Sequence, residues 1–286
     1  MDYRKAAEER KSIREFTDKQ IPENIREDLM EYGKNCLKLI PELETEFIIT
    51  DGAKYNYLEE FAGYEGLTFK APYYLILLSA KKQGYLENAG YISEDMILHM
   101  TDMGIDSCWL TVNEGEALKQ QLGLDTDMAV VAVTALGYGK KQRTLTTLHI
   151  KSKSDVEIRT REGHVAPKIT LEEMVYGDTW HKPADLGEMY VDDGLRNALL
   201  AASYAPTFLN RQSFRLVMTD GKLLFVKILD PLTDEVDAKL NCGAVMLNFA
   251  AVLEERRPFM PQWVLGAPDI NYQLPADCEI VAYCNL

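Results

Sequence analysis

The stretch Phe47-Ile48-Ile49-Thr50-Asp51-Gly52 decides the fold, because it returns 169 positions later as Leu216-Val217-Met218-Thr219-Asp220-Gly221. Each copy is an apolar run typical of a strand, and each ends in an Asp-Gly turn. The same offset aligns two candidate helices, residues 22–35 and 191–204, which precede the two strands. A repeated helix and strand predict two structural units of one kind.

The order of elements continues to match further along the chain. Residues 88–103 and 241–257 are each predicted to form an apolar core helix, and a tryptophan follows each, Trp109 or Trp263. Each half then closes with a strand. The two closing strands are predicted at residues 129–133 and 279–283.

These matches predict an α+β protein of two tandem modules, residues 1–150 and 165–286. A polar and basic connector at about residues 144–168 joins them. A duplicated chain of this kind commonly mimics a homodimer, with a pseudo-twofold axis in place of a true one. The competing interpretation is a chance resemblance between two α+β segments. Four matched elements in the same order favour duplication.

The amino-acid composition limits the kinds of partner that the protein can bind. The 286 residues are 47% hydrophobic and carry a formal net charge of −14. Such an acidic surface argues against nucleic acid and anionic membranes as partners, so an anion site must be local. The five scattered cysteines form no Cys-x-x-Cys pair, and the four histidines lack ligand spacing. Both patterns argue against a disulfide framework or metal site, and they suit the cytoplasm. The N-terminus has no apolar signal core.

The two halves differ in one basic and one polar segment. Arg10-Lys11-Ser12-Ile13-Arg14 occurs once and aligns with residues 179–183, while the loop 205–212 aligns with the unlike segment 36–43. Each half retains a different part, which predicts one composite site between the modules. The basic segment suits a phosphate. If it is helical, Arg10 and Arg14 share one face and Ser12 lies between them.

A second basic cluster, residues 137–143, follows the last strand of the first half. Lys141 and Arg143 alternate, so both can point to one side, and the glycines before them allow close backbone approach. The spacing is not that of a P-loop. A lone cluster is more typical of a solvated surface patch. Two clusters together with a one-sided repeat favour a phosphate site.

In these residues the chain resembles the FMN-dependent nitroreductase family, in the variant that fuses two subunits into one polypeptide. The family opens with an Arg-x-Ser-x-Arg/Lys element that grips the flavin phosphate and ribityl chain. The matching residues here are Arg10, Lys11, Ser12 and Arg14. A later Lys-x-Arg completes the phosphate grip in the family, and Lys141 and Arg143 match it.

The family also has an Ala-Pro-Ser-x-x-Asn-x-Gln-Pro-Trp loop that reaches the flavin ring from the partner subunit. Residues 205–214 resemble it, although Ser213 and Phe214 replace Pro-Trp, a change that concerns the shape of the substrate pocket. The residues that this resemblance assigns to the flavin are Pro206, Thr207, Phe208, Asn210 and Gln212. Residues 104–112 resemble the segment whose backbone amide approaches flavin N5, which assigns that role to Thr111 and Val112.

The resemblance implies both a fold and a function. Each module would be a mostly antiparallel sheet with helices on both faces, and the modules would share a helical interface. The chain would be a monomer that acts as an internal pseudo-dimer and holds one FMN. Electrons would pass from NAD(P)H through FMN to a small electron-poor acceptor such as a nitroaromatic or a quinone. No side chain is expected to be catalytic, because the flavin carries the chemistry.

Two alternatives stay open on the sequence. One is a specialised relative, such as a flavin reductase, a dehalogenase or a dehydrogenase. The other is a flavin-binding or degenerate protein without catalysis. The choice between NADH and NADPH has no signature here, since the chain carries no Rossmann glycine fingerprint. Trp109, Trp263 and His99 are expected to be structural.

Overall fold

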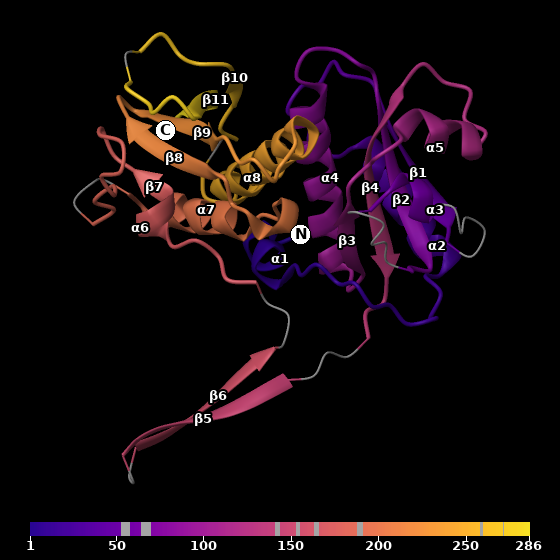
Figure 1. Ribbon diagram of the computed structural model, residues 1–286, viewed down its shortest axis with the longest axis horizontal. Coiled ribbons are helices and arrows are strands. Elements are labelled where there is room, and N and C mark those ends of the chain that lie inside the picture. The colour runs from indigo at the N-terminus through magenta and orange to yellow at the C-terminus, as the bar shows by residue number, and fades with distance from the viewer. Residues whose placement is uncertain are drawn as a thin grey trace.

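The computed structural model describes residues 1–52, 58–63, 70–140, 144–152, 155–162, 166–187, 191–257, 260–270 and 272–286. Within them, two β-sheets lie on either side of a central pair of long helices, α4 (Tyr85–Asp102) and α8 (Glu235–Glu254) (Figure 1). The N-terminal helix α1 (Tyr3–Glu9) lies near the centre and packs on α4, α8 and α7 (Asp193–Tyr204). The molecule is thus organised around a helical interface, as the resemblance implies.

The first sheet is antiparallel and has the order β1-β2-β4-β3. Its strands are β1 (Thr45–Asp51), β2 (Tyr73–Ser79), β3 (Asp106–Leu110) and β4 (Ala129–Gly137). Strand β2 is an unbroken apolar run because both of its faces are buried. Leu75 and Leu77 join the core beneath α4 and α2 (Glu23–Lys34). Ile76 and Leu78 join the core beneath α3 (Leu58–Phe61) and α5 (Gly115–Gln121).

The second sheet has the order β10-β11-β9-β8-β7 and is antiparallel except for the β7–β8 pair. Its strands are β7 (Val175–Tyr176), β8 (Phe214–Thr219), β9 (Lys222–Ile228), β10 (Val264–Leu265) and β11 (Cys278–Asn285). Helices α7 and α8 cover one face, together with the short α6 (Leu171–Met174). Non-helical segments that contribute Trp180 and Ile270 pack on the other face.

The two sheets share a strand order and an irregularity. Strands β8-β9-β11-β10 repeat the order β1-β2-β4-β3. A β-bulge leaves Val131 of β4 without a partner on β2, and a second bulge does the same for Val281 of β11 against β9. These two valines occupy the same place in the closing strands that the sequence aligns, 129–133 and 279–283. Bulges are features that related folds keep, so the shared position is informative.

The central helices cross at a pair of glycines. A Cβ on Gly90 of α4 would lie 2.8 Å from the carbonyl carbon of Leu240, and one on Gly243 of α8 would lie 2.9 Å from that of Gly90. Real Cβ atoms essentially never approach so closely. The contact is also reciprocal. Gly90 faces the carbonyl of Leu240, three residues before Gly243, and Gly243 faces the carbonyl of Glu87, three residues before Gly90. Reciprocal contacts of this kind are typical of a twofold interface.

The connector between the halves is more structured than the sequence suggested. Residues expected to form a polar linker instead form an antiparallel hairpin, β5 (Thr144–Ser152) and β6 (Asp155–Glu162). The hairpin lies apart from the rest of the molecule in Figure 1. Alternating Thr, Leu, Ile and Val residues favour a strand even where the overall composition is polar.

The basic segment at residues 10–14 is not helical. Helix α1 ends at Glu9, and the following chain is extended, with Ser12 in a parallel bridge to Ser107 of β3. The Ile13 N–H donates to the Ser107 carbonyl oxygen at 2.9 Å. Pairing with this strand supplies hydrogen bonds that a helix would otherwise provide, and it overrides the helical periodicity of the charges.

Candidate functional site

A cavity of about 630 Å³ lies where the two halves meet. Its volume is in the range of small-molecule and cofactor sites, roughly 300–1,000 Å³. It is lined by the end of α1 and the basic segment, the end of β3, the loop after α7, and the first turns of α8. We call it the composite cavity. Both halves of the chain contribute to it, as the asymmetry of the repeat predicts.

Most of the residues assigned to a cofactor from the sequence meet in this cavity. Those that line it are Arg10, Lys11, Ser12, Arg14, Thr111, Pro206, Thr207, Phe208 and Asn210. Val112 and Gln212 lie outside its lining. Val112 instead packs against the core beneath α3 and α5. Lys141 and Arg143 lie outside the residues that the structure describes, although Lys140 just before them donates its N–H to the Glu15 carbonyl oxygen at 2.9 Å.

Several cationic groups lie in the lining of the composite cavity. Arg10 is buried, and its Nη1 lies 3.4 Å from the Ser12 Oγ. The side chains of Lys11 and Arg14 are more exposed. Lys168, which the sequence analysis missed, adds a partly buried amine to the lining and donates to the Ala205 carbonyl oxygen at 2.8 Å. Several cations and a hydroxyl in one place fit a phosphate through charge-assisted hydrogen bonds.

A buried carboxyl lies behind these cations. Glu94 of α4 is fully buried, and its Oε1 is 3.8 Å from the Arg10 Nε. Burial raises the pKa of Glu94 to about 7, an effect opposed by the charges of Arg10 and Lys168. Burial, with help from Arg10, lowers the pKa of Lys168 to about 8. Glu94 thus partly balances the positive charge when no anion is bound.

Two polar atoms near Glu94 have no hydrogen-bond partner among the described residues. They are the Arg10 Nε and the Asn248 Oδ1, while the side chains of Trp109 and Asn248 lie near the Glu94 carboxyl and lower its pKa. Buried polar groups are normally paired, so such a cluster beside a cavity indicates that water or ligand atoms complete it. Together with the cationic lining, this incomplete set of hydrogen bonds around Arg10 and Glu94 fits a phosphate-bearing cofactor.

The loop after α7 is held in an unusual backbone conformation. Leu209, Asn210 and Gln212 all have positive φ angles, between 47° and 57°. Side chains fix this path: the Thr207 Oγ1 accepts the Gln212 N–H at 3.1 Å, and the Asn241 Oδ1 accepts the Phe208 N–H at 3.0 Å. The amides of Asn210 and Gln212 donate to the Pro167 carbonyl oxygen. Gln212 therefore anchors the loop rather than facing the cavity.

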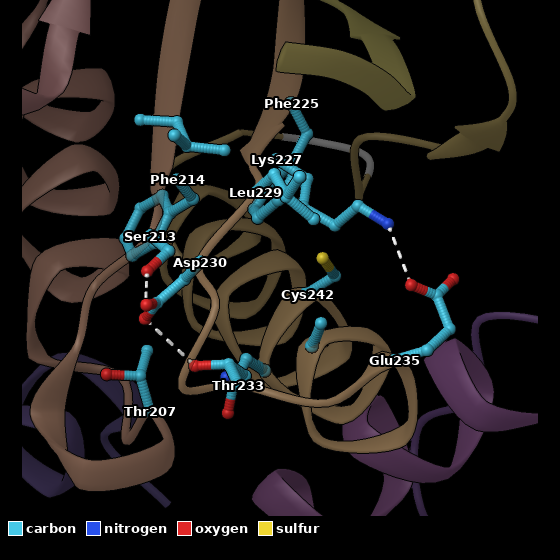
Figure 2. Close-up of a pocket in the computed structure, with 13 residues that line it drawn as sticks. Thr207, Ser213, Phe214, Phe225, Lys227, Leu229, Asp230, Thr233, Glu235 and Cys242 are labelled. Atoms are coloured by element: carbon cyan, nitrogen blue, oxygen red, sulfur yellow. Dashed lines mark hydrogen bonds and ion pairs between the residues drawn. The ribbon is translucent and has the colours of Figure 1, made fainter. Parts of the chain in front are cut away.

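Asp230 holds the same loop from behind. Its carboxylate accepts two bonds from the Arg211 guanidinium, at 2.6 and 3.0 Å, and others from the hydroxyls of Ser213 and Thr233, each at 3.0 Å. The Arg211 hydrogen bond, which is the largest effect, holds the pKa of Asp230 well below its usual range. Figure 2 shows Asp230 between Ser213 and Thr233 in a small pocket of about 40 Å³. This pocket is too small for a cofactor.

A buried carboxyl, that of Asp237, lies in the lining of the composite cavity itself. Asp237 is in the first turn of α8, and its Oδ2 accepts a hydrogen bond from the Thr111 Oγ1 at 3.2 Å. Burial raises the pKa of Asp237 to about 6, with a smaller contribution from Asp234. Sequence reasoning missed this residue. Nothing in the sequence distinguishes it from the other acidic residues at the start of the helix, since only the tertiary structure buries it.

The residues expected to be structural fall into two groups. Trp263 is buried and its Nε1 donates to the Met246 carbonyl oxygen at 3.0 Å, and His99 stacks on Tyr32 with ring centroids 3.7 Å apart. Trp109 differs, because it packs partly against the core but also lines the composite cavity.

The strongly apolar α8 is the one described helix with the length and hydropathy of a membrane span, and its burial in the core accounts for that character.

Two solved structures show what this chain resembles. A nitroreductase from Bacteroides fragilis NCTC 9343 with bound FMN is 23% identical, covers 54% of this chain and 97% of its own, and has a TM-score of 0.43. A putative nitroreductase from Thermotoga maritima MSB8 aligns over 100% of this chain and 94% of its own, with 16% identity and a TM-score of 0.60. This second likeness establishes a nitroreductase-like fold. A search of curated protein sequences gave no match.

The family assignment comes from the sequence itself. Residues 2–176, more than half of the chain, match the model of a family described as "Putative TM nitroreductase". The matched region contains the basic segment, the first sheet and the end of β3, which together form one side of the composite cavity. The chain therefore belongs to this nitroreductase family.

Proposed function

We propose that this chain is an FMN-dependent oxidoreductase of nitroreductase type, with one FMN in the composite cavity. Electrons would pass from NAD(P)H to an electron-poor acceptor such as a nitroaromatic or a quinone. One observation carries the proposal: the basic segment of one half and the polar loop of the other line a single cavity of cofactor size. Membership of a nitroreductase family supports the same chemistry.

The residues present suit an FMN. Arg10, Ser12, Arg14 and Lys168 would hold the phosphate, with Lys11 beside them. Bound FMN would accept a hydride from NAD(P)H and pass it on, while the protein supplies binding and electrostatics. Pro206, Thr207 and Phe208 form the wall that the second half contributes. Because Asp230 and Asn241 fix that loop before any ligand arrives, little conformational entropy would be lost on binding.

We also propose that the chain is a duplicated, internally pseudo-dimeric monomer with modules at residues 1–150 and 165–286. The common strand order, the bulges at Val131 and Val281, and the reciprocal glycine contacts support this. So does a matched hydrogen bond. Asn88 of α4 accepts the Ile40 N–H at 2.8 Å, just as Asn241 of α8 accepts that of Phe208.

Titration of the purified chain with FMN tests the proposed function. Arg14→Ala removes an exposed cation of the cavity, and Arg4→Ala removes a similarly exposed arginine of α1 outside its lining. Charge-assisted hydrogen bonds contribute about 1.5–3 kcal/mol, so Arg14→Ala should weaken FMN binding roughly 10- to 100-fold. Arg4→Ala should bind FMN like the unchanged chain.

Equal FMN affinities for the two variants would remove the phosphate assignment. Oxidation of NADH or NADPH with 1,4-benzoquinone or a nitroaromatic then distinguishes an enzyme from a protein that only binds flavin. FMN binding without turnover of either donor would favour the non-catalytic alternative.

A further inference from the structure

Asp237 stands out when the composite cavity is compared with the equivalent place in the other half. Asn241 and Asn88 bind equivalent loops, so Asp237, four residues before Asn241, corresponds to Gly84, four residues before Asn88. Thr111 follows Leu110, which pairs with Val133. In the other half, Leu265 follows Val264, which pairs with Tyr283. Val133 and Tyr283 occupy the same place in the aligned closing strands, so Thr111 corresponds to Leu265.

The side chains at the two equivalent places differ in polarity. Beside Gly84, the side chains of Ile40 and Leu265 fill the space, and a Cβ on Gly84 would lie 2.7 and 2.5 Å from their methyl carbons. In the composite cavity, Phe208 takes the place of Ile40, and the hydrogen-bonded pair Thr111 and Asp237 takes the place of Leu265 and Gly84. The fold is thus satisfied without a carboxyl at this position.

Burying a carboxyl costs free energy, and Asp237 is not the residue that caps the helix. Asp234 is already the N-cap of α8, accepting the Asp237 N–H at 2.8 Å. The Asp237 side chain instead lies in the wall of the composite cavity, beside Thr111 at the end of β3. The equivalent position in the other half has no carboxyl, yet here the cost of burying one is accepted in the wall of a cavity. This difference indicates that Asp237 has a role in chemistry.

On the basis of the proposed function, we propose that Asp237 is a catalytic acid that donates its proton to a carbonyl oxygen of a quinone acceptor. FMN in its reduced form would supply a hydride to one carbonyl oxygen of the quinone, so that the quinone gains two electrons and FMN loses two. The carboxyl O–H bond of Asp237 breaks while an O–H bond forms on the acceptor, giving the two-electron-reduced hydroquinone. The Asp237 carboxylate then takes a proton from water.

The surroundings of Asp237 keep it suitable for this task near neutral pH. Burial raises its pKa to about 6, Asp234 raises it further, and the hydrogen bond from Thr111 lowers it. Glu87 of α4 is a buried carboxyl on a neighbouring element. Ionisable groups that share the cavity lining with Asp237 include Glu8, Arg10, Lys11, Arg14, Lys168 and Tyr204. An acid whose pKa lies near the working pH is an effective proton donor.

The first test is a direct titration of the ligand-free protein. The ¹³C NMR signal of the Asp237 carboxyl, assigned by its loss in Asp237→Asn, should titrate near pH 6. Thr111→Val removes the hydroxyl that lowers the pKa, so the titration should move to higher pH. A carboxyl that titrates at the ordinary value of about 4 and ignores Thr111→Val would overturn the proposal.

In the second test, FMN-loaded protein is reduced photochemically and then mixed with 1,4-benzoquinone, and the rate of flavin reoxidation is measured. Asp237→Asn should keep FMN affinity and cofactor reduction but slow reoxidation by about 100-fold, the usual effect of losing a general acid. The rate in the unchanged protein should fall tenfold per pH unit above about 6. Thr111→Val should shift that fall upward, and Asp237→Asn should abolish it. Glu235→Gln, at an exposed carboxyl in the same first turn of α8 but outside the cavity lining, is the matched control and should behave like the unchanged protein.

The outcomes separate the two proposals. Normal FMN binding with unchanged reoxidation in Asp237→Asn overturns the role of Asp237 and leaves the proposed function standing. Failure of the unchanged chain to bind FMN overturns both.

Discussion

The glycine crossing between α4 and α8 gives a sharp prediction about stability. In Gly90→Ala the new methyl group would collide with the backbone of Leu240 at 2.8 Å or less, and backbone cannot rotate away as a side chain can. The helices must separate by about 1 Å, a gap that forfeits a quarter to a half of the dispersion attraction across it. Overpacking of this kind costs about 3 kcal/mol.

Urea unfolding followed by circular dichroism measures this effect. Gly115→Ala in α5 is the matched control, because the nearest backbone atom to its new methyl would be 3.1 Å away and the substitution should change stability by no more than about 1 kcal/mol. Since one separation of the helices accommodates both methyl groups, the double variant Gly90→Ala, Gly243→Ala should cost less than the sum of the single variants. An unchanged urea midpoint in Gly90→Ala, or strict additivity in the double variant, would refute the reasoning about a shared close contact.

Two further predictions concern the buried carboxyls around the composite cavity. The pKa of Glu94 is raised from 4.5 to about 7, so without bound anion the protein should lose roughly 3 kcal/mol of folding stability as pH rises through that window. Glu94→Gln should abolish this loss, and parallel profiles of melting temperature against pH for the two proteins would contradict it. Asp230→Ala should weaken FMN binding and destabilise the fold by about 2 kcal/mol, because it releases Arg211, Ser213 and Thr233. Isothermal titration with FMN and thermal melts check this, and an unchanged FMN affinity would exclude a positioning role for Asp230.

The sequence predicted most of the regular structure because apolar periodicity is a local property. The four long helices and the matched strands lie close to their expected ranges, and even the bulge at Val131 falls on the valine aligned with Val281. Helix α8 begins six residues before the expected Asn241, because Asp234 caps an additional polar turn that carries no apolar signal.

The parts that the sequence missed depend on tertiary contacts. The basic segment pairs with Ser107, a partner far away in the sequence, so the helical arrangement that its charge spacing allowed does not occur. Glu94 and Asp237 carry no signal in the sequence that sets them apart from other acidic residues, and only the tertiary structure buries them. Gly90 and Gly243 likewise are needed only because two helices cross closely at these positions, and local sequence patterns do not predict that crossing.

The most direct test of the central claim is native mass spectrometry of the chain saturated with FMN. A single cavity built from both halves predicts one FMN on a 32.4 kDa monomer. Two FMN molecules per chain, or FMN retained only by a dimer, would contradict a composite site completed within one polypeptide.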